Sequence, residues 1–154
     1  MASTTYTVER SRIISAPPDR VYPLIVDFHQ WPRWSPWEDA DPELHRAYSG
    51  NGEGVGAVYA WSGNRKAGAG RMEIVEVEEN RRVEIALDFQ KPFKSTSKIL
   101  FTLEPVDAGT GVTWTMTGKK TLTTKVMGIF KSMDSLVGPD FEKGLARLKA
   151  TTEK

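Results

Sequence analysis

The sequence predicts an α+β fold in which a curved antiparallel sheet of about seven strands wraps around a long C-terminal helix. Three observations lead to this prediction. Residues 43–120 alternate between apolar and polar side chains and are interrupted by short turns of Gly, Asn and Asp. A helical stretch precedes this region, and a longer amphipathic one follows it. A sheet with one apolar face needs a cover, and the final helix is long enough to lie across it.

The composition is that of an ordinary globular domain and excludes several kinds of site. The 154 residues include 21 basic and 20 acidic side chains and no Cys. Disulfides, thiolate zinc sites and cysteine nucleophiles are therefore excluded. A net charge of +1 gives no overall attraction for polyanions. We expect one domain over residues 1–154 that is cytoplasmic, binds no nucleic acid, has no stable membrane insertion, and is a monomer or homodimer.

The first predicted strand, Tyr6–Ser15, carries two arginines in an unusual place. Regular alternation puts Arg10 and Arg12 on the same face as the apolar residues Val8 and Ile14. A guanidinium inside a cavity would bind an anion or a carbonyl, so both are candidate catalytic residues that stabilise an enolate. The competing interpretation, which we favour, is a bulge or an edge position that puts both side chains in solvent.

Two short helices are expected after this strand. Pro17 and Pro18 end the ladder, and apolar residues then repeat at helical spacing from Val21 to Phe28. His29 follows and is a candidate general base near neutral pH. No metal site and no cofactor are expected, because His29 and His45 lack the spacing of paired ligands.

Three tryptophans, Trp31, Trp34 and Trp37, stand within seven residues and form the most distinctive local pattern. Each indole buries a large apolar area and has one N–H to satisfy. We favour a structural role in which they plug one end of the sheet. Two alternatives stay open: a gate to a ligand site, for which Trp34 and Trp37 are candidates, or a contact surface for another protein.

Further strands are predicted near 43–49, 54–62, 67–78, 82–89, 95–105 and 111–120, joined as an antiparallel meander. If the aromatic and methionine side chains of these strands point inward, they form a lining suited to a flat or elongated hydrophobic molecule. The alternative is an ordinary packed core. The candidate ligand-binding residues are Tyr59, Trp61, Met72, Phe89, Phe101, Trp114 and Met116. Tyr59 is also a candidate proton donor.

The final helix is predicted from Asp140 to Lys149. Its apolar residues follow the spacing i, i+4, i+7 from Phe141 to Leu148, and Phe141 joins the ligand-binding candidates. Gly138–Pro139 is expected to separate this helix from a shorter, looser helical piece that starts at Lys125.

The order of elements and one motif together resemble a known superfamily. The motif is Ile14-x-Ala16-Pro17-Pro18-x-x-Val21-Tyr22, and the superfamily is the START-like, helix-grip (SRPBCC) superfamily, which contains birch-pollen-allergen-like lipid binders and aromatic polyketide cyclases. Further segments look like its bacterial polyketide cyclase/dehydrase family: Trp31-Pro32-x-Trp34-Ser35-Pro36-Trp37, Trp61-Ser62-Gly63, Gly68-x-Gly70-x-Met72, Lys91-Pro92-Phe93, Gly111-Val112-Thr113-Trp114 and Gly138-Pro139-Asp140-Phe141. The resemblance implies this fold and a cavity, but no particular reaction.

The sequence therefore predicts a protein that binds a lipid-, aromatic- or polyketide-like molecule between the sheet and the C-terminal helix. The alternative is a cofactor-free cyclase or dehydratase that acts on a poly-β-ketone in the same cavity. In that case Arg10 or Arg12 polarises a carbonyl, Tyr59 donates a proton, and His29 or a water acts as base. Serine-hydrolase chemistry is not expected, because the chain has no Gly-x-Ser-x-Gly elbow.

Overall fold

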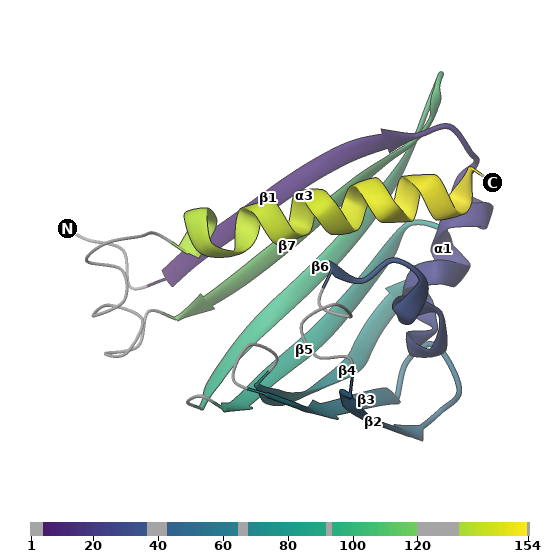
Figure 1. Cartoon of the computed structure of the whole chain (residues 1–154). Coiled ribbons are helices and arrows are strands. Elements are labelled where there is room, and N and C mark those ends of the chain that lie inside the picture. The colour runs from purple at the N-terminus through teal and green to yellow at the C-terminus, as the bar shows by residue number, and fades with distance from the viewer. Residues whose placement is uncertain (1–4, 37–42, 65–67, 92–93, 120–132, 154) are drawn as a thin grey trace.

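A seven-stranded antiparallel sheet is the largest element of the computed structural model, which describes residues 5–36, 43–64, 68–91, 94–119 and 133–153. The strand order is β1-β7-β6-β5-β4-β3-β2, so β1 and β2 are the two edges. The sheet curves around the helices on its concave side (Figure 1), which confirms the predicted fold class. The strands are β1 (Thr5–Ile14), β2 (His45–Gly50), β3 (Ala57–Ser62), β4 (Ala69–Glu78), β5 (Arg82–Lys91), β6 (Ser95–Val106) and β7 (Gly109–Lys119).

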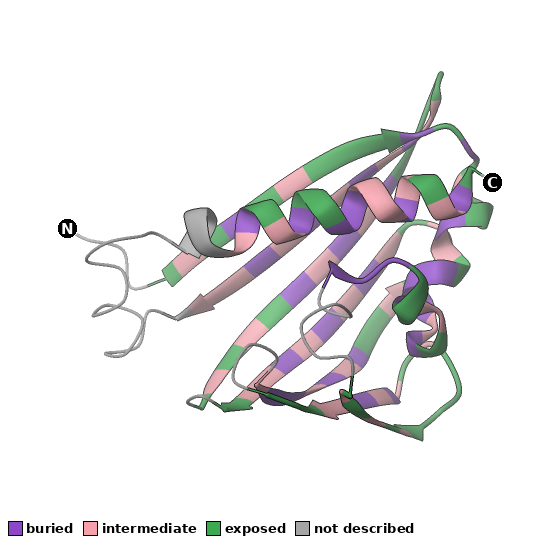
Figure 2. Cartoon of the chain, in the orientation of Figure 1, coloured by how far each residue is buried: buried purple, intermediate pink, exposed green. Residues whose placement is uncertain are grey.

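Alternating burial along the strands explains why the sheet has one apolar face. In β5, Val83, Ile85 and Leu87 are buried, and the residues between them are only half-buried. Buried segments recur along the strands where these face the helices (Figure 2). Successive side chains of a strand point to opposite faces, so this pattern places the core on the concave side.

Two tight turns set the order of the last strands, as the sequence predicted. Asn80 adopts a φ of 61° between β4 and β5, and Gly109 a φ of 141° at the start of β7. A Cβ at Gly109 would lie 2.1 Å from the carbonyl oxygen of Ile14, so no larger residue fits there. The turn is tighter than predicted, and β7 begins at residue 109 rather than 111.

Two short helices follow β1: α1 (Pro18–Val26) and the 3-10 helix η1 (Phe28–Arg33). Pro18 lies in the first turn of α1, where its missing N–H costs no hydrogen bond. The carboxylate of Asp27 caps η1 by accepting a hydrogen bond of 2.9 Å from the backbone N–H of His29. Both helices turn apolar residues toward the core.

The C-terminal helix α3 (Met133–Thr152) runs along β1 and β7 on the concave side (Figure 1). The predicted boundary at Gly138–Pro139 is wrong, because α3 continues through both residues. Gly138 lets the helix approach β1 closely: a Cβ there would lie 2.2 Å from a guanidinium nitrogen of Arg10. The looser piece predicted from Lys125 lies outside the described residues as far as residue 132. From Met133 onward it is part of α3.

Candidate functional site

The concave face has two halves that differ in how completely their aromatic side chains are covered. We call Trp31, Trp34, Phe101, Trp114 and Phe141 the sealed cluster; all are buried. We call Tyr48, Tyr59, Trp61 and Phe89 the aromatic panel; in this group only Tyr59 is fully buried, and the other three are half-buried. Only the aromatic panel leaves ring surface partly accessible, and a ligand needs accessible apolar surface.

The tryptophans of η1 and the turn after it are part of the sealed cluster. The Trp31 indole donates to the carbonyl of Ile25 at 2.9 Å, and that of Trp34 donates to Leu24 at 2.8 Å. Both rings pack edge-on against Phe101. Their N–H groups are therefore satisfied inside the protein, which agrees with the plug interpretation. Trp37 lies outside the described residues.

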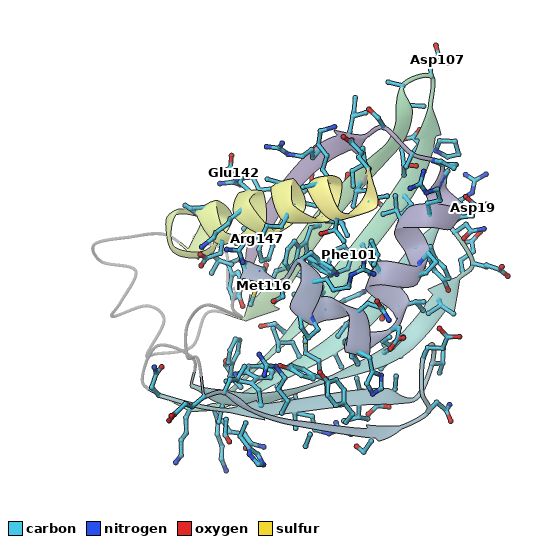
Figure 3. The ribbon with its side chains drawn as sticks, turned by 45° about the vertical axis from the view of Figure 1, so that its right-hand side comes forward. Asp19, Phe101, Asp107, Met116, Glu142 and Arg147 are labelled. Atoms are coloured by element: carbon cyan, nitrogen blue, oxygen red, sulfur yellow. The ribbon has the colours of Figure 1, made fainter. Side chains whose placement is uncertain are left out.

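Helix α3 closes the sealed cluster from above. The rings of Trp114 and Phe141 stack with centroids 4.1 Å apart and an angle of 7° between their planes. Gly144 makes room for this contact, since a Cβ there would lie 2.8 Å from the Trp114 ring. Phe101 lies beneath α3 on the concave side, and so does Met116, which is also buried (Figure 3). This half of the face is packed as a core.

The aromatic panel lies toward the other edge, on β2, β3 and β5. Trp61 stacks on Tyr59 at a centroid distance of 6.0 Å and meets Phe89 edge-on at 5.7 Å. Tyr48 packs on Tyr59 at 5.3 Å. The Trp61 ring lies over Gly70 of β4, where a Cβ would be 2.6 Å from it. The glycine thus lets the indole lie against the sheet.

A cation borders the aromatic panel. Arg46 of β2 is the cross-strand partner of Trp61, and Tyr48 is the partner of Tyr59. Burial raises the pKa of Tyr59, and the charge of Arg46 together with its hydrogen bond to Tyr59 opposes this rise. Burial also raises the pKa of Tyr48, against the same charge. Both hydroxyls are therefore neutral hydrogen-bond donors at physiological pH.

The candidate catalytic residues are not brought together at one place. Arg10 forms an ion pair with Glu142 of α3 at 3.5 Å, and Arg12 is exposed. The pairing of β1 with β7 is unbroken, so there is no bulge, and the arginines lie on the edge strand at the far side of the sheet from Tyr59. The predicted solvent placement at an edge therefore describes Arg12, whereas Arg10 is half-buried against α3.

His29 lies beside the aromatic panel rather than beside the arginines. Its ring stacks on Tyr48 with centroids 4.2 Å apart, and its Nδ1 lies 2.9 Å from the carboxylate of Asp27. The side chain is 53% exposed. His29 and Tyr59 therefore flank Tyr48 and share one edge of the concave face. In the part of the chain that the structure describes, no three His, Asp or Glu side chains group as metal ligands would.

Comparison with known proteins identifies the family. The family model described as polyketide cyclase/dehydrase and lipid transport matches residues 5–153. The chain belongs to this family. Among the described residues of this family member, no helix is long and apolar enough to cross a membrane.

Solved structures share the fold of this family member. A protein from Mesorhizobium loti is 19% identical, with 96% of this chain and 97% of that chain covered and a TM-score of 0.70. One from Chromobacterium violaceum is 17% identical, with 96% and 98% covered and a TM-score of 0.69. The Aha1 dimer from Colwellia psychrerythraea is 18% identical, with 94% and 96% covered and a TM-score of 0.62. No curated protein sequence matches the chain.

Three groups at the concave face of this polyketide cyclase/dehydrase family member were missed by sequence reasoning: Arg46, Tyr48 and Gly70. Arg46 was missed because its face depends on the register of β2 against β3, which local alternation in a six-residue strand does not fix. Gly70 was assigned to a motif, but its function as a seat for Trp61 depends on a neighbouring strand. The available signal was the spacing of Arg46 and Tyr48, which are two residues apart and therefore lie on the same face of a strand.

Proposed function

We propose that the protein binds a hydrophobic small molecule on the concave face, against the aromatic panel. The observation that carries this proposal is the partial exposure of Tyr48, Trp61 and Phe89 on the inner side of a sheet whose other half is sealed. Exposed apolar area costs about 25 cal/mol per Å², so a ligand that covers these rings gains affinity from their burial. The panel, rather than the sealed cluster, supplies the contact surface.

The family supports a ligand of lipid, aromatic or polyketide type. Its description combines polyketide cyclisation with lipid transport, and both tasks require apolar molecules to be held out of water. The half-buried rings of Trp61 and Phe89 leave aromatic surface for such a molecule to cover. Arg46 and the tyrosine hydroxyls at the panel's border favour a ligand that also has an oxygen acceptor.

A second candidate function is ring closure or dehydration of a poly-β-ketone at the same place. The shared edge of Tyr59, Arg46 and His29 favours it. A base removes a proton from the carbon between two carbonyls, the enolate attacks a third carbonyl, and Tyr59 donates a hydrogen bond to the developing oxyanion. Under this proposal Tyr59→Phe abolishes turnover of a poly-β-ketone mimic while its binding persists.

The binding proposal is tested by removing one ring of the panel. Native mass spectrometry of the gently purified protein identifies a co-purified apolar molecule, and a fluorescent apolar dye, anilinonaphthalene sulfonate, provides a binding assay. Trp61→Ala is expected to lose the co-purified molecule and to weaken dye binding. Ile13→Ala is the matched control, because Ile13 is 52% exposed on the opposite face of the sheet. Equal dye affinity in the wild type and Trp61→Ala would contradict the proposal.

Three further properties are proposed with it. The chain acts as one domain over residues 1–154, it is cytoplasmic, and it is a monomer or homodimer. The Colwellia psychrerythraea Aha1 structure is described as a dimer, which makes the homodimer worth testing. Light scattering after size-exclusion chromatography determines the oligomeric state, and cell fractionation determines the compartment. Because Trp31 and Trp34 are buried, we do not propose a protein-contact role for the Trp-rich loop.

A further inference from the structure

A pair of hydroxyl groups lies on the concave face at the opposite side from Tyr59. The hydroxyl of Tyr6 on β1 and that of Ser97 on β6 are 2.8 Å apart and form a hydrogen bond across β7. Between them is Gly118, where a Cβ would lie 2.6 Å from the Tyr6 hydroxyl oxygen. The Tyr6 side chain therefore lies over the glycine, with its hydroxyl directed along the face toward β6.

This pair belongs to the same cross-strand row as Tyr59. The register pairs Tyr59 with Met72, Met72 with Leu87, Leu87 with Ser97, Ser97 with Gly118 and Gly118 with Tyr6. The row thus has a hydroxyl at each side and two apolar side chains between them. Three strand spacings separate Tyr59 from Ser97, about 14 Å along the sheet, and the concave curvature brings the side-chain tips closer.

The pair keeps hydrogen-bonding capacity that its own contact does not use. A glycine inside a strand weakens it, and often marks a place where another group must approach closely. Tyr6 and Ser97 are only half-buried, so the pair borders accessible space. Burial raises the pKa of Tyr6, so its hydroxyl is neutral. Two hydroxyls that bond to each other use one O–H, which leaves the second O–H and several lone pairs for a third oxygen.

We propose that Tyr6 and Ser97 form a second polar anchor of the ligand site, which binds an oxygen substituent at the end of the ligand remote from Tyr59. This inference rests on the proposed function. The matching ligand is a rigid, flat fused-ring molecule whose ring face covers Met72 and Leu87 and which has an oxygen at each end. A fatty acid does not match, because its single polar group reaches one anchor only.

The test compares two dyes that differ by one hydroxyl. Anthraflavic acid is an anthraquinone with a hydroxyl on each outer ring. Its partner probe, 2-hydroxyanthraquinone, carries only one of these hydroxyls. Isothermal titration calorimetry of the wild type is expected to show roughly threefold to tenfold tighter binding of anthraflavic acid, the worth of one hydrogen bond. Tyr6→Phe and Ser97→Ala are each expected to remove this preference and to leave the affinity for the partner probe unchanged.

The control variant is Tyr22→Phe, which removes a hydroxyl of α1 that lies near Glu53 and Glu79. It is expected to keep the wild-type preference. If the wild type binds both dyes equally, or if the preference survives in Tyr6→Phe and Ser97→Ala, the second anchor is overturned while the binding function stands. If the wild type binds neither dye, both the anchor and the proposed function are overturned.

Discussion

Glycines act in opposite ways in the two halves of the concave face. In the sealed half they lie on the helix: Gly144 lets α3 press on Trp114, and Gly138 lets it approach Arg10. On the strands they receive a ring instead: Gly70 receives the Trp61 ring in the half with the aromatic panel, and Gly118 of β7 receives Tyr6 near the opposite edge of the sheet. A glycine on helix α3 lets the helix pack closely on the sheet, whereas a glycine on a strand lets an aromatic ring lie against the sheet. The first arrangement makes a core, and the panel ring seated on Gly70 stays half-buried, as the proposed ligand surface requires.

The largest expected effect is loss of a stacked ring in the sealed cluster. Phe141→Ala should reduce the free energy of unfolding by about 3–5 kcal/mol, because it removes a fully buried ring that stacks on Trp114. Urea denaturation measures this change. A cost below about 1 kcal/mol would mean that α3 does not seal this half and that the contrast between the halves is false.

A smaller effect is expected when a strand glycine beside the aromatic panel is replaced by alanine. Gly70→Ala places a methyl 2.6 Å from Trp61 and 2.7 Å from the Asp88 carbonyl oxygen, so the indole must rise from the sheet. We expect a loss of about 1–3 kcal/mol in stability and weaker dye binding. Gly111→Ala is the matched control, since its Cβ meets nothing closer than 3.8 Å. Equal dye affinities for both variants would contradict the assigned function of Gly70.

Alkaline pH should reveal the burial of the tyrosine hydroxyls. Burial raises the pKa of Tyr6 and Tyr59 above the ordinary 10.0, so these groups ionise first in the unfolded chain. The stability they contribute is complete below pH 10 and falls as the pH rises above it. Ultraviolet absorbance of the phenolate during a pH titration follows the ionisation. Tyr59→Phe should remove a phenol that ionises above pH 10. Loss of a phenol that ionises at or below pH 10 would contradict the burial described.

The smallest effect is expected at the C-terminal end of α3. The carboxylate of the exposed Glu153 accepts hydrogen bonds from Lys149 and from the backbone N–H of Ser15, and these hold its pKa below the ordinary 4.5. The stabilisation is present above pH 4.5 and is lost as the pH falls through the lowered pKa. The thermal unfolding temperatures of wild type and Glu153→Gln should therefore differ slightly near neutral pH. The difference should vanish in acid.

Most of the fold was predictable from sequence because it depends on local chemistry. Strand alternation and the turn residues Asn80 and Gly109 act within a few positions, and they fixed the meander correctly. The prediction failed at Pro139, where the helix continues and Gly138 packs against Arg10 of β1. A local rule for proline could not include that contact, because it joins residues far apart in the chain.

The two kinds of aromatic environment were not predictable. Trp61 and Trp114 are the same residue type on strands of the same sheet and face the same side, yet one is half-buried and the other 1% exposed. The difference arises from the path of α3, which covers Trp114. Sequence alternation indicates the face of a residue but not what lies above it, so both tryptophans entered the list of ligand candidates.

The most direct test of the two-halves account is proton–nitrogen NMR of the indole N–H groups during titration with anthraflavic acid. Trp61→Phe assigns the Trp61 signal by its disappearance. The account predicts that this signal shifts on binding, while those of Trp31 and Trp34, which are hydrogen-bonded to backbone carbonyls, and of the sealed Trp114 stay in place. Shifts of these three signals with an unchanged Trp61 would place the ligand in the sealed half and contradict the account.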